Sequence, residues 1–151
     1  MTSKTKSPSA AALEETANCA CLNLRKATRA VSRMYDEILR PSGLKVTQFS
    51  VLATVAGKGP ASMTTISRAL VMDRTTLTRN LKPLLDRGLV KVGKGTDRRQ
   101  KPIAITRKGE DTLARAMPLW RQANEHIVDG IGAARWQGMS RLLEETIRLS
   151  R

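Results

Sequence analysis

The segment from Ser62 to Thr106 reads SMTTISRALVMDRTTLTRNLKPLLDRGLVKVGKGTDRRQKPIAIT, and its pattern decides the fold. Asp73 is a good N-cap residue and Gly88 is a good residue to follow a helix end, so a helix is predicted between them. Apolar residues recur along this helix at helical spacing, on a face that we expect to be buried: Leu77, Leu81, Leu84 and Leu85.

The opposite face of this predicted helix carries cations and small hydroxyls: Arg74, Thr75, Thr78, Arg79 and Lys82. Such a face suits a helix in the major groove of duplex DNA, where arginines and hydroxyls meet base edges and phosphates. We predict groove contacts from Thr75, Thr76 and Arg79, and phosphate contacts from Arg74 and Lys82.

A second, shorter helix is predicted over residues 63–70, with Ser62 as its N-cap and its core face formed by Ile66, Ala69 and Leu70. Backbone N–H groups at the start of a helix can hold a phosphate. We therefore assign Ser62, Thr64 and Ser67 to a phosphate-binding helix start.

Two short β-rich runs, residues 89–92 and 102–106, predict a hairpin with a basic tip. We expect Arg99 to enter a narrow minor groove and Asp97 to fix its guanidinium. Three further cations of the tip should attract the DNA backbone: Lys94, Arg98 and Lys101.

These motifs resemble the MarR family of bacterial transcription regulators. Asp97-Arg98-Arg99, with Ile105-Thr106 and Gly109 behind them, is similar to the wing signature of that family, and residues 64–79 are similar to its helix-turn-helix. The resemblance implies a mainly α fold with a β-hairpin wing. It also implies a homodimer, built from N- and C-terminal helices, that binds palindromic operators, represses by default, and is released by a ligand or by oxidation.

The chain length of 151 residues favours one domain. We expect a flexible tail over residues 1–12 and a single domain over 13–151. Within that domain, residues 13–46 and 107–151 would supply the dimerisation helices and 47–106 the DNA-binding lobe. The expected helices outside the lobe's central motif are 13–39, 47–56 (with Thr47 as N-cap), 107–131 and 136–149.

The formal net charge of +14 is concentrated in the predicted DNA-reading region. Residues 58–108 hold 13 Lys/Arg against 3 Asp, a balance of +10. Clustered basicity of this kind is typical of a polyanion-binding surface. Aromatic residues make up only 3% of the chain, which disfavours single-strand binding by base stacking. An architectural double-stranded DNA-binding protein without an effector switch is the alternative.

Composition also limits other functions. The sequence contains no catalytic constellation, and His126 is the only histidine, so we expect no enzyme activity, no cofactor and no metal site. It contains no long apolar run for a membrane span and no signal-peptide core. Two cysteines two residues apart form no disulfide framework, so a cytoplasmic protein is expected.

A sensor is predicted on the first long helix. The region around Cys21 and Tyr35 resembles the organic-hydroperoxide-sensing branch of the family, in which the matching cysteine becomes a sulfenic acid. Tyr35 lies about 21 Å along a helix from Cys21, so only a partner subunit's tyrosine could reach that thiol. Cys19 is additional, Arg25 follows Cys21 by one turn, and the branch's second tyrosine is replaced by Val46. Redox sensing, binding of a small molecule beside Arg25 and Tyr35, and plain packing of both cysteines remain open.

Overall fold

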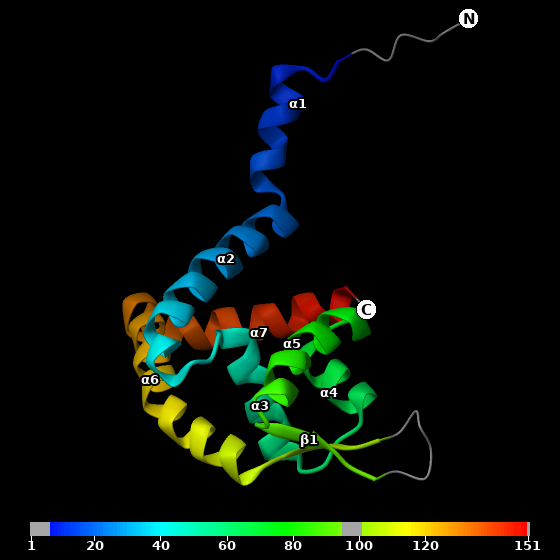
Figure 1. The fold of residues 1–151 in the computed structure, drawn as a ribbon. Coiled ribbons are helices and arrows are strands. Elements are labelled where there is room, and N and C mark those ends of the chain that lie inside the picture. The colour runs from blue at the N-terminus through cyan, green and yellow to red at the C-terminus, as the bar shows by residue number, and fades with distance from the viewer. Residues whose placement is uncertain (1–6, 95–100, 151) are drawn as a thin grey trace, which may run out of the picture. The chain divides into compact units, whose positions relative to one another are not determined.

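The computed structural model describes residues 7–94 and 101–150. The chain divides into two compact units, residues 1–34 and 35–151. In the described part it is mainly helical with one two-stranded antiparallel hairpin, which confirms the predicted fold class (Figure 1).

The first unit contains three helical segments: α1 (Ala10–Glu15), the 3-10 turn η1 (Thr16–Asn18) and most of α2 (Ala20–Leu39). The prediction of one helix over 13–39 is wrong, because Cys19 has an extended backbone (φ −60°, ψ 119°). The Asn23 side chain donates to the Ala17 carbonyl at 3.1 Å across this break. Local side-chain bonds of this kind compete with a continuous helix.

Helix α1 begins inside the segment that was predicted to be a flexible tail. Ser9 caps the helix, since its hydroxyl accepts from the Ala12 N–H at 3.2 Å. Residues 10–12 are therefore helical, although residues 1–6 lie outside the described part of the chain.

The second unit begins with the end of α2 and continues with these elements: η2 (Arg40–Ser42), α3 (Val46–Lys58), α4 (Met63–Leu70), α5 (Arg74–Asp86), β1 (Val90–Val92), β2 (Ile103–Ile105), α6 (Arg107–Ile131) and α7 (Ala133–Leu149). In the hairpin, Val90 lies opposite Ile105, and a single bridge joins Ala61 to Ile103. The element order matches the predicted helix-turn-helix followed by a wing.

The core of this unit lies where α3, α4 and α5 pack together, with the hairpin against them (Figure 1). Leu77 and Leu84 of α5 are fully buried, as predicted. Leu85 is 37% exposed and Ala69 is exposed, so their assignment to the core was wrong. The physical reason for Leu85 is helical geometry, because consecutive residues point about 100° apart and Leu84 already occupies the core side.

Helix α3 begins one residue earlier than expected, with Lys45 rather than Thr47 at the N-cap position. The N–H of Val46 donates to Oδ1 of Asp36 at 2.7 Å, so a side chain ten residues upstream holds the helix start. The helix also continues through Gly57 to Lys58. The predicted end at residue 56 was therefore two residues short.

Helix α6 has its predicted limits, whereas α7 begins at Ala133 instead of residue 136. Leu142 on α7 is 63% exposed, and two other apolar residues of α7, Met139 and Ile147, are also exposed. Of the helices in the described part, none is long and apolar enough to cross a membrane.

Candidate nucleic-acid interface

The start of α5 is fixed by a tight cap. Asp73 accepts two hydrogen bonds from Thr76, one from its N–H at 2.8 Å and one from its hydroxyl at 2.7 Å. These bonds favour the carboxylate and lower the pKa of Asp73. The cap sets the first turn of α5, and with it the direction in which Arg74 and Thr75 leave the helix.

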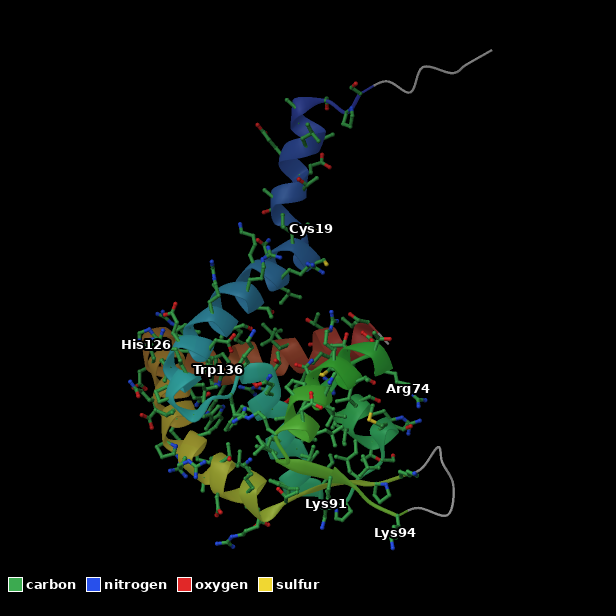
Figure 2. All side chains as sticks on the ribbon, in the orientation of Figure 1. Cys19, Arg74, Lys91, Lys94, His126 and Trp136 are labelled. Atoms are coloured by element: carbon green, nitrogen blue, oxygen red, sulfur yellow. The ribbon has the colours of Figure 1, made fainter. Side chains whose placement is uncertain are left out.

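The outer face of α5 brings five predicted DNA-binding residues together around a shallow hollow of about 520 Å³: Arg74, Thr75, Thr78, Arg79 and Lys82. All five are exposed, and Figure 2 shows the Arg74 side chain pointing outward from α5. Lys82 is held by Asp86 in an exposed ion pair of 2.7 Å. The hollow therefore presents three cations and two hydroxyls to solvent.

Two of the threonines on α5 already use their hydroxyl protons within the helix. Thr76 is half-buried and donates to Asp73, and Thr78 donates to the Arg74 carbonyl at 2.8 Å. Each hydroxyl keeps lone pairs that can accept a hydrogen bond. In this geometry Thr76 serves the cap, and Thr75 is the more exposed of the two adjacent threonines.

The start of α4 groups the three residues predicted to hold a phosphate. Ser62 caps the helix by accepting from the Thr65 N–H at 3.1 Å. Thr64 is exposed, and Ser67 donates to the Thr64 carbonyl at 3.1 Å. The predicted cap is confirmed; phosphate binding by these residues stays a prediction.

The hairpin carries two further exposed cations, one of which lies beside α5. Lys94 follows β1 and Lys101 precedes β2, and both side chains are exposed. Figure 2 shows Lys94 pointing outward. A second hollow of about 390 Å³ joins α5 to the hairpin, with Arg74, Lys82 and Lys101 in its lining. The tip residues Asp97, Arg98 and Arg99 lie outside the described residues.

Comparison with known proteins identifies this arrangement. A family model described as MarR family matches residues 42–100. The structure of the Mycobacterium tuberculosis transcriptional regulator MosR superposes with a TM-score of 0.78 at 35% identity, covering 89% of this chain and 97% of that one. The chain belongs to the MarR family.

A second MosR structure and one further relative bear on this family assignment. A structure of the same M. tuberculosis regulator in complex with DNA matches at 38% identity and a TM-score of 0.78, covering 89% of this chain and 99% of that one. YwoH of Bacillus subtilis strain 168, an HTH-type transcriptional regulator, is 31% identical over 87 residues. That match spans 58% of this chain and 64% of the length of YwoH.

The base of the wing in this MarR-family chain is anchored to α6. The Thr106 hydroxyl donates to the Gly88 carbonyl at 2.7 Å and accepts from the Gly109 N–H at 3.1 Å. A Cβ on Gly109 would lie 2.1 Å from the Leu89 carbonyl oxygen, far inside van der Waals contact. Gly109 of the wing signature is therefore required by close packing.

Sequence reasoning missed three residues that hold α5 and α3 in place: Asp36, Arg87 and Lys108. Arg87 donates from Nη1 to the Gly43 carbonyl at 2.7 Å, and Lys108 donates to the Arg87 carbonyl at 2.8 Å. The first bond joins residues 44 positions apart. No local pattern in the sequence signals a contact at that separation.

The predicted sensor residues fall into both units. Cys19 and Cys21 are free and exposed in the first unit, and Arg25 is exposed as well. The Asn23 N–H donates to the Cys19 carbonyl at 3.0 Å, so Cys19 stands at the N-cap position of α2. Both thiols are thus accessible at the beginning of a helix.

Tyr35 lies in the second unit and is 8% exposed. Its hydroxyl donates to Oδ1 of Asn124 at 3.3 Å, and burial raises the pKa of Tyr35.

His126 is exposed, and no group of three potential metal ligands occurs within residues 7–94 and 101–150.

Proposed function

We propose that this MarR-family regulator binds double-stranded DNA sequence-specifically, as a homodimer on a palindromic operator, and acts as a repressor. The observation that carries the proposal is the outer face of α5, where three cations and two hydroxyls surround one exposed hollow. The DNA-bound structure of the similar MosR supports the same use of this fold.

A dimer accounts for the exposed apolar side chains at both ends of the chain. Leu22 and Leu24 of α2 are 40% and 38% exposed, and Leu142 of α7 is 63% exposed. Pairing of these faces across a two-fold axis would remove apolar area from water. Two recognition helices related by that axis would enter major grooves about 34 Å apart, one turn of the duplex.

DNA binding can be tested on a duplex selected from a random library by the wild-type protein. Arg79→Ala and Arg99→Ala should each weaken binding by about tenfold or more, since a good arginine–base contact is worth about 1–3 kcal/mol. Wild-type affinity should also fall steeply with added salt, because phosphate contacts release counterions.

The architectural alternative makes a different prediction in the same assay. A regulator should prefer its selected duplex over random DNA by about 10³ or more, whereas an architectural protein should show little preference. A wild-type protein that binds both duplexes equally at matched salt would overturn sequence-specific regulation and leave the alternative.

For release from DNA we propose thiol oxidation, with binding of a small molecule as the second candidate. Cys19 and Cys21 are both exposed; Cys19 lies at the extended break before α2, and Cys21 lies in the first turn of α2. An organic hydroperoxide ROOH would oxidise the Cys21 thiol to a sulfenic acid and leave as the alcohol ROH. Attack by the Cys19 thiol would then form a disulfide and release water.

Peroxide titration of the DNA complex distinguishes the candidates. Wild type, Cys19→Ser and Cys21→Ser are each compared before and after a mild organic hydroperoxide. Release that disappears with Cys21→Ser supports a thiol switch centred on that residue. Peroxide that leaves all three complexes intact contradicts the thiol switch, and titration with phenols and aromatic carboxylates then tests the second candidate.

A further inference from the structure

One side chain joins the end of α5 to a turn that lies 44 residues away in the sequence. Arg87 follows α5 directly, and its Nη1 donates to the Gly43 carbonyl at 2.7 Å. Gly43 ends η2 with a φ of 71°, and a Cβ there would lie 3.2 Å from Nη2 of Arg87. The lack of a side chain at Gly43 leaves room for the guanidinium to approach.

The η2–α3 corner, residues 42–46, which accepts the hydrogen bond from Arg87, is held by several contacts of its own. Leu44 is 2% exposed, so its side chain anchors the corner in the core. The Ser42 hydroxyl accepts from the Leu44 N–H at 3.2 Å, and Asp36 accepts from the Val46 N–H at 2.7 Å. A bond from a helix to such a corner ties that helix to a fixed point.

Two backbone contacts of Arg87 also hold the end of α5. Its N–H donates to the Pro83 carbonyl at 3.2 Å, and its carbonyl accepts from Lys108 of α6 at 2.8 Å. Arg87 therefore links three elements, α5, the η2–α3 corner and α6, through its backbone and its side chain.

The geometry of α5 makes this end important for DNA reading. Thr75 lies twelve residues before Arg87, about 18 Å along a helix. A tilt of about 5° at that distance moves Thr75 by more than 1 Å, while a recognition site must be held within about 0.5 Å. Phosphate contacts by long cations tolerate such a shift better than bidentate base contacts do.

We propose that Arg87 is a positioning residue for base recognition, which sets the tilt of α5 through its bond to the Gly43 carbonyl and need not touch DNA. The proposal rests on the DNA-binding function proposed above. It assigns to Arg87 an effect on specificity that differs from the effect of a phosphate-binding cation.

The test compares Arg87→Gln, Arg87→Lys and Lys82→Gln in the full chain. Each protein is titrated with the selected duplex and with a random duplex of equal length at several salt concentrations, after circular dichroism and thermal unfolding have confirmed that it is folded. Arg87→Gln should weaken binding to the selected duplex about tenfold and binding to the random duplex less than twofold. The slope of log K against log salt should stay as in wild type.

The other two variants distinguish a positioning role of Arg87 from a phosphate contact. Arg87→Lys keeps a donor that can reach the Gly43 carbonyl and should restore most of the specific affinity. Lys82→Gln removes a predicted phosphate contact, so it should weaken both duplexes and lower the salt slope by about one.

Three results would overturn the assignment of Arg87. It fails if Arg87→Gln binds the selected duplex as wild type does, or if it weakens both duplexes equally with a lower salt slope, which marks a phosphate contact. It also fails if Arg87→Lys is as weak as Arg87→Gln. A wild-type protein without preference for the selected duplex would instead refute the proposed function itself.

Discussion

The two units of this chain differ in how completely they bury their apolar side chains. Residues 35–151 bury a set of large side chains completely, including Leu39, Leu52 and Ile66. The described part of residues 1–34 contains no buried residue, and Leu13 is 57% exposed. Both units are nevertheless mostly helical in their described parts.

This difference teaches that helical pattern and stability are separate properties. The apolar stripe of the first unit consists of Leu24, Ala27 and Val31 of α2, which recur at helical spacing as the leucines of α5 do. Only the leucines of α5 include fully buried side chains. Isolated helices gain little stability in water without tertiary packing of their apolar face. The first unit is thus expected to depend on a second copy, and the second unit on its own core.

The largest effect should come from the core of the second unit. Leu77 is fully buried, so Leu77→Ala should lower the free energy of unfolding by about 3 kcal/mol, through lost burial and a residual cavity. Urea unfolding at several protein concentrations measures this loss. The matched substitution Leu142→Ala, at a side chain that is 63% exposed, should cost less than about 0.5 kcal/mol in the monomer. Equal losses would remove the contrast between buried and exposed leucines.

The apolar stripe of the first unit should behave in the opposite way. Leu24→Ala should weaken dimerisation about tenfold, or about 1.4 kcal/mol, and leave the unfolding of the monomer nearly unchanged. Sedimentation equilibrium of wild type and variant measures the first quantity. A variant that loses monomer stability and keeps its dimer affinity would show that the stripe packs within its own chain.

Helix boundaries that depend on neighbouring residues could be predicted from the sequence. In the second unit, Ser62, Asp73 and Gly88 were correct helix boundaries, because caps act through neighbouring residues. The predicted α6 agreed at both ends. One error inside this unit, at the start of α3, came from a side chain that acts at a distance, since Asp36 holds that start from ten residues upstream.

In the candidate site, too, local features could be predicted from the sequence and long-range contacts could not. The spacing on α5 was sufficient to place five predicted DNA-binding side chains on one face, because helical periodicity is a local property. The tie from Arg87 to Gly43 was not predictable, because it depends on how two elements 44 residues apart pack together. In the first unit, the break at Cys19 depends on short side-chain bonds, which periodicity does not detect.

A smaller effect compares two nearly identical caps. Ser9 and Ser62 have the same backbone conformation, with φ −69° and ψ near 158° and 157°, and both accept from the N–H three residues on. Ser62→Ala should cost about 1 kcal/mol in global stability, the usual loss for a serine N-cap. Ser9→Ala should leave the unfolding midpoint unchanged, since α1 has no buried residues. Equal shifts in thermal unfolding would mean that α1 unfolds together with the core.

The smallest effect concerns the charge on the cap of α5. Hydrogen bonds from Thr76 lower the pKa of Asp73 below its ordinary value of 3.8. A carboxyl group with a lower pKa in the folded state stabilises the protein above its unfolded pKa, and this contribution disappears as pH falls through the folded pKa. Wild type should therefore lose stability below about pH 4 more steeply than Asp73→Asn, which keeps a good cap without a titrating group.

Thermal unfolding of wild type and Asp73→Asn between neutral pH and about pH 2.5 measures this difference. Glu15→Gln is the control from the first unit, because Glu15 makes no capping hydrogen bond and its removal should leave the pH profile of wild type in place. Parallel profiles for wild type and Asp73→Asn would show that the cap gains nothing from its charge. In that case the start of the recognition helix would be held by hydrogen-bond geometry alone.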